Sequence, residues 1–256
     1  MVETSEVTNA SDNNEAEPLE LAVVMPVYNE EECIAGVVRD WLSMLEKTGV
    51  SARMIVLNDG SKDGTADALA AFAGDGRVEV INKANSGHGP TILVGYRRAV
   101  EIAPWVFQID SDDELKPAAF PRLWSKRTRY DALFGSRYGR DQNIARGFIS
   151  AVSRLTVRLF FKRGVRDVNV PYRLMRAYLL RQVIEQLPPD IFAPNVIISG
   201  ALARGGARIY NMPVVHEGRK TGAVSIVKWK LWKAAFKSFR QTLCYRPTVQ
   251  LKRRKA

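Results

Sequence analysis

Short apolar runs alternate with longer helix-forming segments along the first half of this chain. The runs are rich in aliphatic and aromatic residues and have the length of buried strands; they span residues 21–25, 54–57, 78–81 and 106–109. Amphipathic segments lie between them, at residues 31–47, 64–73 and 89–103. This alternation predicts an α/β fold in which helices cover both faces of a mainly parallel central sheet. In the second half we expect further strands at residues 132–134, 170–174 and 208–210, with helices between them.

Polar residues follow each of the first four predicted strands. These polar stretches are residues 28–30, 58–61, 82–89 and 110–114. Ligands of open parallel sheets bind beyond the carboxyl ends of the strands. We therefore expect the functional site to be built from these four loops.

The composition excludes several classes of protein. The chain has 256 residues, of which 46% are hydrophobic and 25% charged, so it can form a substantial core and is not disordered as a whole. No apolar run approaches the ~20 residues that a membrane-spanning helix needs. Cys33 and Cys244 are far apart in sequence and lack metal-ligand neighbours, which argues against a disulfide scaffold or a zinc ribbon. Nothing at the N-terminus marks the chain for secretion, so we expect an intracellular setting.

Charge is distributed unevenly. The net charge is +11, yet the first 20 residues contain six acidic residues and neither Lys nor Arg. We interpret residues 1–19 as a disordered acidic tail. From Arg219 onward there are twelve Lys or Arg residues and no Asp or Glu. This asymmetry indicates a polyanionic partner, such as nucleic acid, anionic lipid or a phosphorylated substrate, unless the basic segment is only a solvated tail.

Two acidic residues, Asp110 and Asp112, directly follow the strand predicted at residues 106–109. If the extended conformation continues, both side chains point to the same side, with Glu114 next in line. Carboxylate oxygens suit a hard cation, and Mg²⁺ commonly binds one or two carboxylates together with substrate phosphates and water. The alternative is a loop of turn-forming and helix-capping acids, since Pro117 is well placed in the first turn of a following helix. The spacing leaves both interpretations open.

The loop after the first strand has neither G-x-x-x-x-G-K-[ST] nor G-x-G-x-x-G, which argues against a P-loop enzyme and a dinucleotide-binding domain. After the second strand, Asn58, Asp59, Gly60 and Ser61 are typical of a turn followed by a helix cap. The carboxylate of Asp59 could also accept a hydrogen bond from the N–H of a nucleotide base. His88 is either an exposed residue at a helix start or a contact for donor or acceptor.

Four segments in succession resemble the motifs of family 2 glycosyltransferases, which have the GT-A fold. They are PVYNEE at residues 26–31, NDGSKDGT at 58–65, NSGHG at 85–89 and DSD at 110–112. The likeness is closest to the polyprenyl-phosphate branch of the family, which includes dolichol-phosphate mannose synthases, and it runs from about residue 21 to residue 222. The resemblance implies a GT-A glycosyltransferase domain over residues 20–222.

The resemblance also implies a role for each matching residue. The donor nucleotide would contact Pro26, Tyr28, Glu30, Asp59, Gly87, Asp110 and Arg219; Mg²⁺ or Mn²⁺ would bind Asp110, Asp112 and Glu114. Asp112 and Arg219 would be the catalytic residues, whereas Arg137 of the sequence GSRY and His216 would lie on the acceptor side. The sequence departs from the family pattern at Val224, where serine is usual, and at Glu114, where this branch often has Gln.

A phosphate acceptor would remove the need for a catalytic base. Transfer to a hydroxyl needs a base near the acceptor oxygen, whereas a phosphate monoester is largely a dianion at pH 7 because its second pKa is near ~6. Many hydroxyl-using relatives carry a Glu-Asp or Thr-Glu-Asp element, and the corresponding stretch here is DIFAPN at residues 190–195. We therefore expect a lipid-phosphate acceptor, with Asp190 as an alternative base.

The last segment, residues 223–256, is predicted to form a basic amphipathic helix and tail. Apolar and aromatic residues between 224 and 243 share one helical face, and Lys and Arg share the opposite face. Such a helix can lie in a membrane interface, where each basic residue contributes ~1 kcal/mol. A similar stripe occurs within residues 148–162. The alternative for both is packing against the core or against a second subunit.

We therefore predict a metal-dependent, inverting glycosyltransferase that uses a UDP- or GDP-linked sugar and a polyprenyl-phosphate acceptor. It would work in the cytoplasm, attached peripherally to the inner face of the cell membrane, and could form a homodimer or homotetramer. An alternative acceptor is the hydroxyl of a saccharide or glycolipid in cell-envelope polysaccharide synthesis. An alternative from another class is a basic nucleic-acid-binding module. We expect no nucleic-acid partner, because that alternative leaves the acids at the strand ends unexplained.

Overall fold

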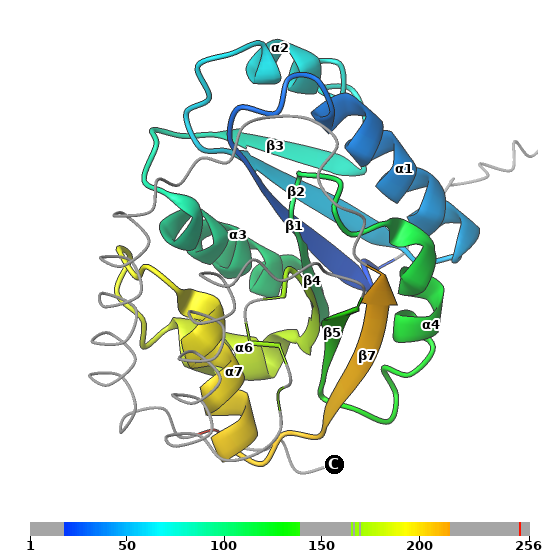
Figure 1. Cartoon of the computed structure of the whole chain (residues 1–256), viewed down its shortest axis with the longest axis vertical. Helices are drawn as coiled ribbons and strands as arrows, with labels where there is room; N and C mark the ends of the chain where they lie inside the picture. Colours follow the sequence, from blue (N-terminus) through cyan, green and yellow to red (C-terminus); the bar gives the residue numbers. More distant parts are fainter. Residues whose placement is uncertain (1–17, 139–164, 166, 169, 216–250, 252–256) are drawn as a thin grey trace, which may run out of the picture.

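The structure, a computed structural model, describes residues 18–138, 165, 167, 168, 170–215 and 251 (Figure 1). Its centre is a seven-stranded sheet with the order β3-β2-β1-β4-β6-β5-β7. The strands are β1 (Leu21–Val27), β2 (Ala52–Asn58), β3 (Val78–Asn82), β4 (Trp105–Ile109), β5 (Ala132–Tyr138), β6 (Tyr172–Arg176) and β7 (Ile209–Val215). Strands β1 to β4 are parallel to one another, β6 is antiparallel to both β4 and β5, and β7 is parallel to β5. The prediction of a mainly parallel sheet is confirmed.

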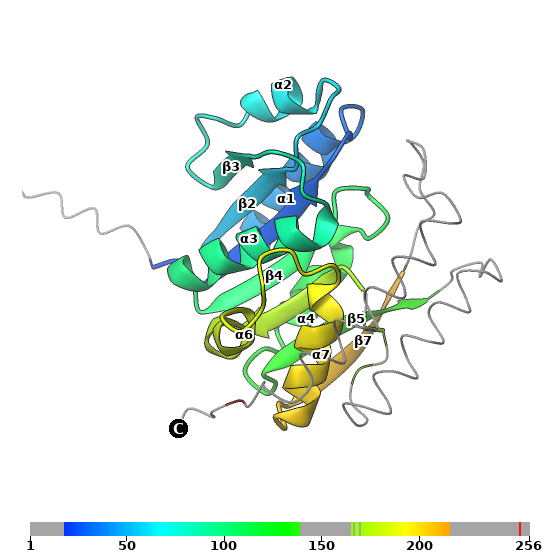
Figure 2. The same ribbon diagram turned by 90° about the vertical axis from the view of Figure 1, so that its left-hand side faces the viewer.

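Helices lie on both sides of this sheet (Figure 1, Figure 2). They are α1 (Ile34–Lys47), α2 (Thr65–Ala70), α3 (His88–Ile102), the short 3₁₀ helix η1 (Pro117–Ala119), α4 (Phe120–Trp124), α6 (Ala177–Ile184) and α7 (Pro194–Arg204). Helices α3, α6 and α7 pack against one another on one side, whereas α1 contacts α2 and η1 on the other.

The centre of the sheet is buried because its strands carry apolar side chains on both faces. All seven residues of β1 and all five of β4 are buried. On one face, Trp41 of α1 packs against Phe107 and Tyr172, with ring centroids 5.4 and 6.0 Å apart. On the other face, Gly95 lets α3 approach closely, since a Cβ atom there would lie 2.4 Å from a methyl carbon of Val24.

The order of the strands reverses between β1 and β4. From β1 the chain continues to β2 and β3 on one side and then returns to β4 on the other side. Strand β1 pairs with β2 along its whole length but with β4 only from Leu21 to Val24. Pro26 lies beyond that last paired residue, where its lack of an N–H costs no ladder bond to β4. The carboxyl ends of β1 and β4 therefore diverge at the type of switch point where ligands of parallel sheets bind.

Most element bounds agree with the sequence predictions, and the differences have local causes. The helices expected at 31–47, 64–73 and 89–103 are α1, α2 and α3. Strand β6 begins two residues later than expected, directly after Pro171, which cannot donate to the ladder. Strand β7 continues to Val215 because Met212 and Val214 alternate with exposed neighbours, as in a half-buried strand.

Several predicted segments lie outside the described residues. They are the acidic tail apart from residues 18 and 19, the stripe within residues 148–162, and the C-terminal amphipathic segment 223–256 apart from Leu251. Leu251 packs against the end of α7, where a Cβ atom on Gly205 would come within 2.4 Å of it. Within the described part of the chain, no helix has the length and apolar character needed to cross a membrane.

Candidate active site

The loops that follow β1 and β2 are joined by hydrogen bonds between side chains and backbone. Asn29, in the left-handed region at φ 54°, donates its N–H to Ser61 Oγ at 3.0 Å, and its Oδ1 accepts the N–H of Lys62 at 2.9 Å. The N–H of Glu30 donates to Thr65 Oγ1 at 2.9 Å. Asn tolerates this backbone conformation better than most residues. The two loops consequently form one rigid rim beyond the strand ends.

Three predicted donor contacts lie on this rim. Pro26 is buried at the end of β1, Tyr28 is 37% exposed, and Glu30 is half-buried. The thiol of Cys33 lies 3.4 Å from Glu30 Oε2 and 3.6 Å from the carbonyl oxygen of Ser111. The loop after β1 therefore contacts the loop after β4, and the two border the switch point together.

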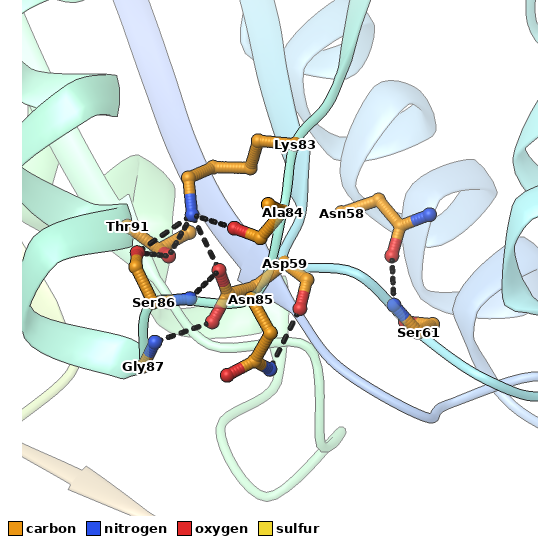
Figure 3. Close-up of polar contacts among 9 residues, drawn as sticks. All are labelled: Asn58, Asp59, Ser61, Lys83, Ala84, Asn85, Ser86, Gly87 and Thr91. Carbon is orange, nitrogen blue, oxygen red and sulfur yellow. Dashed lines mark hydrogen bonds and ion pairs between the residues drawn. The ribbon is translucent and has the colours of Figure 1, made fainter.

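Asp59, directly after β2, is the centre of a second group of contacts (Figure 3). Its Oδ1 accepts from Lys83 Nζ at 2.5 Å and from the N–H of Ser86 at 2.9 Å, and its Oδ2 accepts from the N–H of Gly87 at 2.9 Å. Burial by itself raises the pKa of Asp59, but the hydrogen bonds from Lys83 and Ser86 outweigh it and hold the pKa below its usual range. Asp59 is therefore an anion that organises the loop between β3 and α3.

The same loop is fixed by a close approach of two backbones. Asn85 Nδ2 donates to the carbonyl oxygen of Asp59 at 2.8 Å. Gly60 has φ 66°, and a Cβ atom on it would lie 2.7 Å from the backbone nitrogen of Asn85. Gly87, at φ 91°, begins the turn into α3. Both carboxylate oxygens of Asp59 are engaged within the protein, by Lys83, Ser86 and Gly87. The contact of Asp59 with a nucleotide base, which the resemblance implies, therefore remains a prediction.

Sequence reasoning missed Lys83. Its ammonium group donates to Asp59, to the carbonyl oxygen of Ala84 at 2.7 Å, to Ser86 Oγ at 2.7 Å and to Thr91 Oγ1 at 3.2 Å. The available signal was a basic residue two positions after the strand predicted at residues 78–81, in a loop of small polar residues.

The predicted acidic group follows β4. Asp110 Oδ1 accepts from Gln108 Nε2 at 3.1 Å and lies 3.9 Å from His88 Nε2. Burial raises the pKa of Asp110, and the nearby Glu114 raises it further, whereas His88 and Arg137 act in the opposite direction. A half-buried carboxylate of this kind is stabilised as an anion by an added positive charge.

The chain does not stay extended after Asp110. Residues 111–115 form successive bends, and Asp113 takes φ 58°. The N–H of Glu114 donates to Asp112 Oδ1 at 3.2 Å, and Asp113 pairs with Lys116. The extended geometry on which we based a shared side for both carboxylates is therefore wrong, because the bends begin at Ser111, between the two acids.

The donor set nevertheless fits a hard divalent cation. Asp110, Asp112 and Glu114 supply only oxygen atoms, which Mg²⁺ and Mn²⁺ prefer. Among the residues that the structure describes, no three His, Cys, Asp or Glu side chains are grouped so that they could hold a metal ion by themselves. A cation at this position would take further ligands from substrate phosphates and water, as Mg²⁺ sites commonly do.

Arg137 lies near the end of β5. Its guanidinium group forms a two-pronged pair with Asp167, at 2.8 Å from Nε to Oδ2 and 3.2 Å from Nη2 to Oδ1. Its positive charge also acts on Asp110. The place of Arg137 on the acceptor side remains a prediction.

Two predicted residues, His216 and Arg219, lie outside the described residues. Asp190 is exposed in the segment before α7. That segment meets the start of α3, since a Cβ atom on Gly89 would lie 2.2 Å from the carbonyl oxygen of Phe192. Residues of the second half of the chain therefore complete the site from the side of α3.

Comparison with known proteins gives a consistent result. The family model described as glycosyl transferase family 2 matches residues 22–186. An uncharacterized protein of Methanocaldococcus jannaschii is 31% identical over 202 residues, which cover 74% of this chain and 84% of that protein. The undecaprenyl-phosphate 4-deoxy-4-formamido-L-arabinose transferase of Pectobacterium atrosepticum is 26% identical over 206 residues. That match covers 79% of this chain but only 61% of the transferase.

Two solved structures with a similar fold contain UDP or a UDP-sugar. Glucosyl-3-phosphoglycerate synthase of Mycobacterium tuberculosis, crystallised with Mn²⁺, UDP and glucosyl-3-phosphoglycerate, has a TM-score of 0.65 and 18% identity. That match covers 89% of this chain and 80% of the synthase. Residues 1–349 of S. aureus TarS, in complex with UDP-GlcNAc, have a TM-score of 0.59 and 17% identity, covering 91% and 68% of the two chains.

Proposed function

The chain belongs to glycosyl transferase family 2 and has the GT-A fold, so it is a glycosyltransferase, and from this premise we propose that it transfers a sugar from a nucleoside diphosphate to a polyprenyl phosphate. The observation that carries the proposal is the position of Asp110, directly after β4, where the strand order of the sheet reverses. The rim formed by the loops after β1 and β2 lies at the same end of the sheet.

We propose that the donor is a UDP- or GDP-sugar bound between these loops. Tyr28 and Glu30 would contact the nucleotide from the rim, and the loop fixed by Asp59 and Gly87 would close the pocket beside α3. Two related folds that were crystallised with UDP or a UDP-sugar support a uridine donor.

We propose that Asp110, Asp112 and Glu114 hold Mg²⁺ or Mn²⁺ together with the donor diphosphate. When bound, such a cation neutralises the charge that develops on the departing diphosphate. Asp110 and Asp112 would orient the diphosphate through their carboxylate oxygens, and Arg219 would add a charge-assisted hydrogen bond to it. The crystals of the mycobacterial synthase with Mn²⁺ and UDP support a divalent cation in this fold.

We propose that the acceptor attacks as a phosphate dianion, with inversion at the sugar carbon. An acceptor phosphate oxygen forms the new bond to that carbon as the bond to the donor diphosphate breaks, and no proton has to be removed first. In the stretch DIFAPN at residues 190–195, the described acid is the exposed Asp190, which fits a reaction that needs no base. Arg137 and His216 would attract the phosphate on the acceptor side. The naming of a related protein as an undecaprenyl-phosphate transferase supports a lipid acceptor.

A lipid acceptor also requires contact with a membrane. We propose that the enzyme is cytoplasmic and binds the inner face of the cell membrane peripherally, through the basic amphipathic segment within residues 223–256. Its aromatic and basic residues match those of helices that lie in a membrane interface. A homodimer or homotetramer would present several such segments to one surface and strengthen the attachment.

The test is an acceptor comparison. The purified chain is incubated with Mn²⁺ and radiolabelled UDP- or GDP-sugars, and with undecaprenyl phosphate, undecaprenol or saccharides as acceptors. We expect label in the organic phase only with undecaprenyl phosphate, because undecaprenol has the same chain without the ionised nucleophile. Transfer to a saccharide hydroxyl, with no transfer to the lipid phosphate from any donor, would overturn the proposed acceptor and favour the saccharide alternative.

A further inference from the structure

A polar side chain lies inside the most deeply buried part of the sheet. Gln108 belongs to β4, whose other residues are tryptophan, valine, phenylalanine and isoleucine, and its side chain is fully buried. An amide in such a place costs free energy unless its donors and acceptor are bonded. Tyr96 of α3 is also fully buried, and Asn195 of α7 is 8% exposed. The polar groups of these three side chains form hydrogen bonds with one another.

Hydrogen bonds link all three side chains. The hydroxyl of Tyr96 lies 2.9 Å from Asn195 Oδ1 and 3.3 Å from Gln108 Oε1, and Asn195 Nδ2 donates to Gln108 Oε1 at 3.0 Å. Gln108 Nε2 then donates to Asp110 Oδ1 at 3.1 Å. Each bond fixes the orientation of the next amide, and such chains strengthen one another in a medium of low dielectric constant. The last donor in the chain reaches the carboxylate that follows β4.

Asn195 is itself anchored through its backbone. Its carbonyl oxygen accepts from Ser199 Oγ at 2.7 Å and from Arg173 Nη1 at 3.3 Å. The guanidinium group of Arg173 is fully buried, lies 4.4 Å from the ring centre of Phe134, and donates to Ser199 and to the carbonyl oxygen of Val168. The first turn of α7 is thereby held on the sheet beside Gln108, because Gln108 and Arg173 are directly paired between β4 and β6.

The segment that leads into α7 also contacts the start of α3. Ile191 and Phe192 lie against Gly89, where a Cβ atom would come within 2.5 and 2.2 Å of their carbonyl oxygens. The neighbouring His88 is the residue that lies 3.9 Å from Asp110. The segment before α7 thus meets the start of α3 next to the residue that lies near Asp110, and Figure 2 shows both helices on one side of the sheet.

From this arrangement we propose that Gln108 and Asn195 are positioning residues, which orient the Asp110 carboxylate toward the cation. The inference rests on the proposed function, because it takes Asp110 as a ligand of the cation. Gln108 donates to one oxygen of the carboxylate, and Asn195 prevents the amide of Gln108 from turning away. Groups that hydrogen-bond to a metal ligand commonly change metal affinity about 10- to 100-fold when they are removed.

The first test measures Mn²⁺ affinity directly. Free Mn²⁺ is followed by electron paramagnetic resonance during titration of the full chain in the presence of UDP. We expect Gln108→Met, which keeps the length of the side chain, to raise the dissociation constant of Mn²⁺ about 10-fold or more. Asn195→Asp, which keeps the acceptor for Tyr96 but removes the donor to Gln108, should raise it by a smaller factor. We expect kcat to fall more than the KM of the nucleotide sugar rises.

The matched control is Ser199→Ala. Ser199 is fully buried in the same helix, one turn after Asn195, and its hydroxyl does not contact Gln108 or Asp110. We expect this variant to have a lower thermal unfolding midpoint but an unchanged Mn²⁺ affinity. If Ser199→Ala weakens Mn²⁺ binding as much as Gln108→Met does, the network serves only stability and the inference is overturned.

Two further outcomes separate the inference from the proposed function. Normal Mn²⁺ binding by folded Gln108→Met overturns the inference alone. Absence of UDP-dependent Mn²⁺ binding by the unaltered chain overturns both. If Gln108→Met does not fold, Gln108→Glu replaces it, since it keeps the acceptor for Asn195 and removes the donor to Asp110. Wild-type affinity in Gln108→Glu would then overturn the inference.

Discussion

The ammonium group of Lys83 lies 2.5 Å from a carboxylate oxygen of Asp59, and this ion pair joins the loop after β2 to the loop after β3 (Figure 3). The two side chains are 19% and 5% exposed. Lys83 also donates to Thr91, so the pair is connected to the second turn of α3. A pair so far removed from water leaves an uncompensated charge behind when either partner is lost.

We expect Lys83→Met to lower the free energy of unfolding by about 3 kcal/mol, the lower end of the usual cost of breaking a buried ion pair. Because Asp59 then loses a strong donor, the loop that carries Gly87 loosens and UDP binding weakens. Urea denaturation and titration with UDP measure the two effects. The control is Lys62→Met, at an exposed position where the structure uses only the backbone N–H, and its stability should stay within about 0.5 kcal/mol. An unchanged urea midpoint in Lys83→Met would contradict the prediction.

The alternation of strands and helices was predictable because each element carries its own signal. Strand β1 is an unbroken apolar run, and the polar residues that follow Ile109 stand out against it. The rule that ligands bind beyond the carboxyl ends of parallel strands then gave the correct end of the sheet without any knowledge of long-range contacts.

The contacts between loops could not be predicted in the same way. Asp59 meets Lys83 across 24 residues, and Gln108 meets Asn195 across 87 residues, so no local pattern specifies either pair. A buried strand that contains Gln108 indicates that some partner must satisfy the amide. The identity of that partner depends on where β6 and α7 return to the sheet. The turn at Asp113 was missed because residues other than glycine rarely adopt a positive φ.

Gly89 has no room for a side chain. A Cβ atom there would lie 2.2 and 2.5 Å from the carbonyl oxygens of Phe192 and Ile191, and backbone atoms cannot yield as a flexible side chain can. We expect Gly89→Ala to displace the segment before α7 and to destabilise the protein by about 1–3 kcal/mol. Transferase activity should fall as well, because the displaced segment borders His88 and Asp110. Urea denaturation and the acceptor assay measure the two effects.

The matched control is Gly36→Ala, in the exposed part of α1, where a Cβ atom would meet nothing within 4 Å. Alanine in a helix interior is favoured over glycine by about 0.5–1 kcal/mol, so this variant should be more stable than the unaltered chain and equally active. Equal stability of Gly89→Ala and the unaltered chain would argue against the close approach at Phe192.

Removal of one proposed ligand should abolish cation-dependent binding without unfolding the protein. Asp112 lies in the bends after β4, outside the sheet. We expect Asp112→Asn to lose Mn²⁺-dependent UDP binding and to reduce turnover at least about 100-fold, because the cation contributes several kcal/mol to stabilising the departing diphosphate. Asp113→Asn is the control, since Asp113 pairs with Lys116 and asparagine tolerates its positive φ.

Chelation by EDTA should stop the unaltered enzyme, and added Mn²⁺ should restore it. Full activity in EDTA would contradict the metal-dependent mechanism.

The dependence of stability on pH should reveal the contribution of the Asp131 carboxylate, which joins the starts of β5 and β7. Asp131 accepts hydrogen bonds from the N–H, Nε and Nη2 of Arg208 at 2.9, 3.1 and 2.9 Å and lies 3.5 Å from Arg176. Burial by itself raises the pKa of Asp131, but the bonds from Arg208 and the charge of Arg176 hold it below its ordinary value of 3.8.

A carboxyl group whose pKa is lower in the folded protein binds fewer protons there than in the unfolded chain. Its stabilising effect is therefore complete above the unfolded value of 3.8 and is lost as the pH falls through the lower folded pKa.

We expect Asp131→Asn to be less stable than the unaltered chain at neutral pH, and the two urea midpoints to converge below pH 3.8. The difference between the two curves isolates Asp131, because the raised pKa of Asp110 is common to both. Asp40→Asn, at an exposed position of α1, should follow the unaltered curve throughout. If the urea midpoints of Asp131→Asn and the unaltered chain differ by the same amount at every pH, the charge of Asp131 contributes nothing to stability beyond the shape of its side chain.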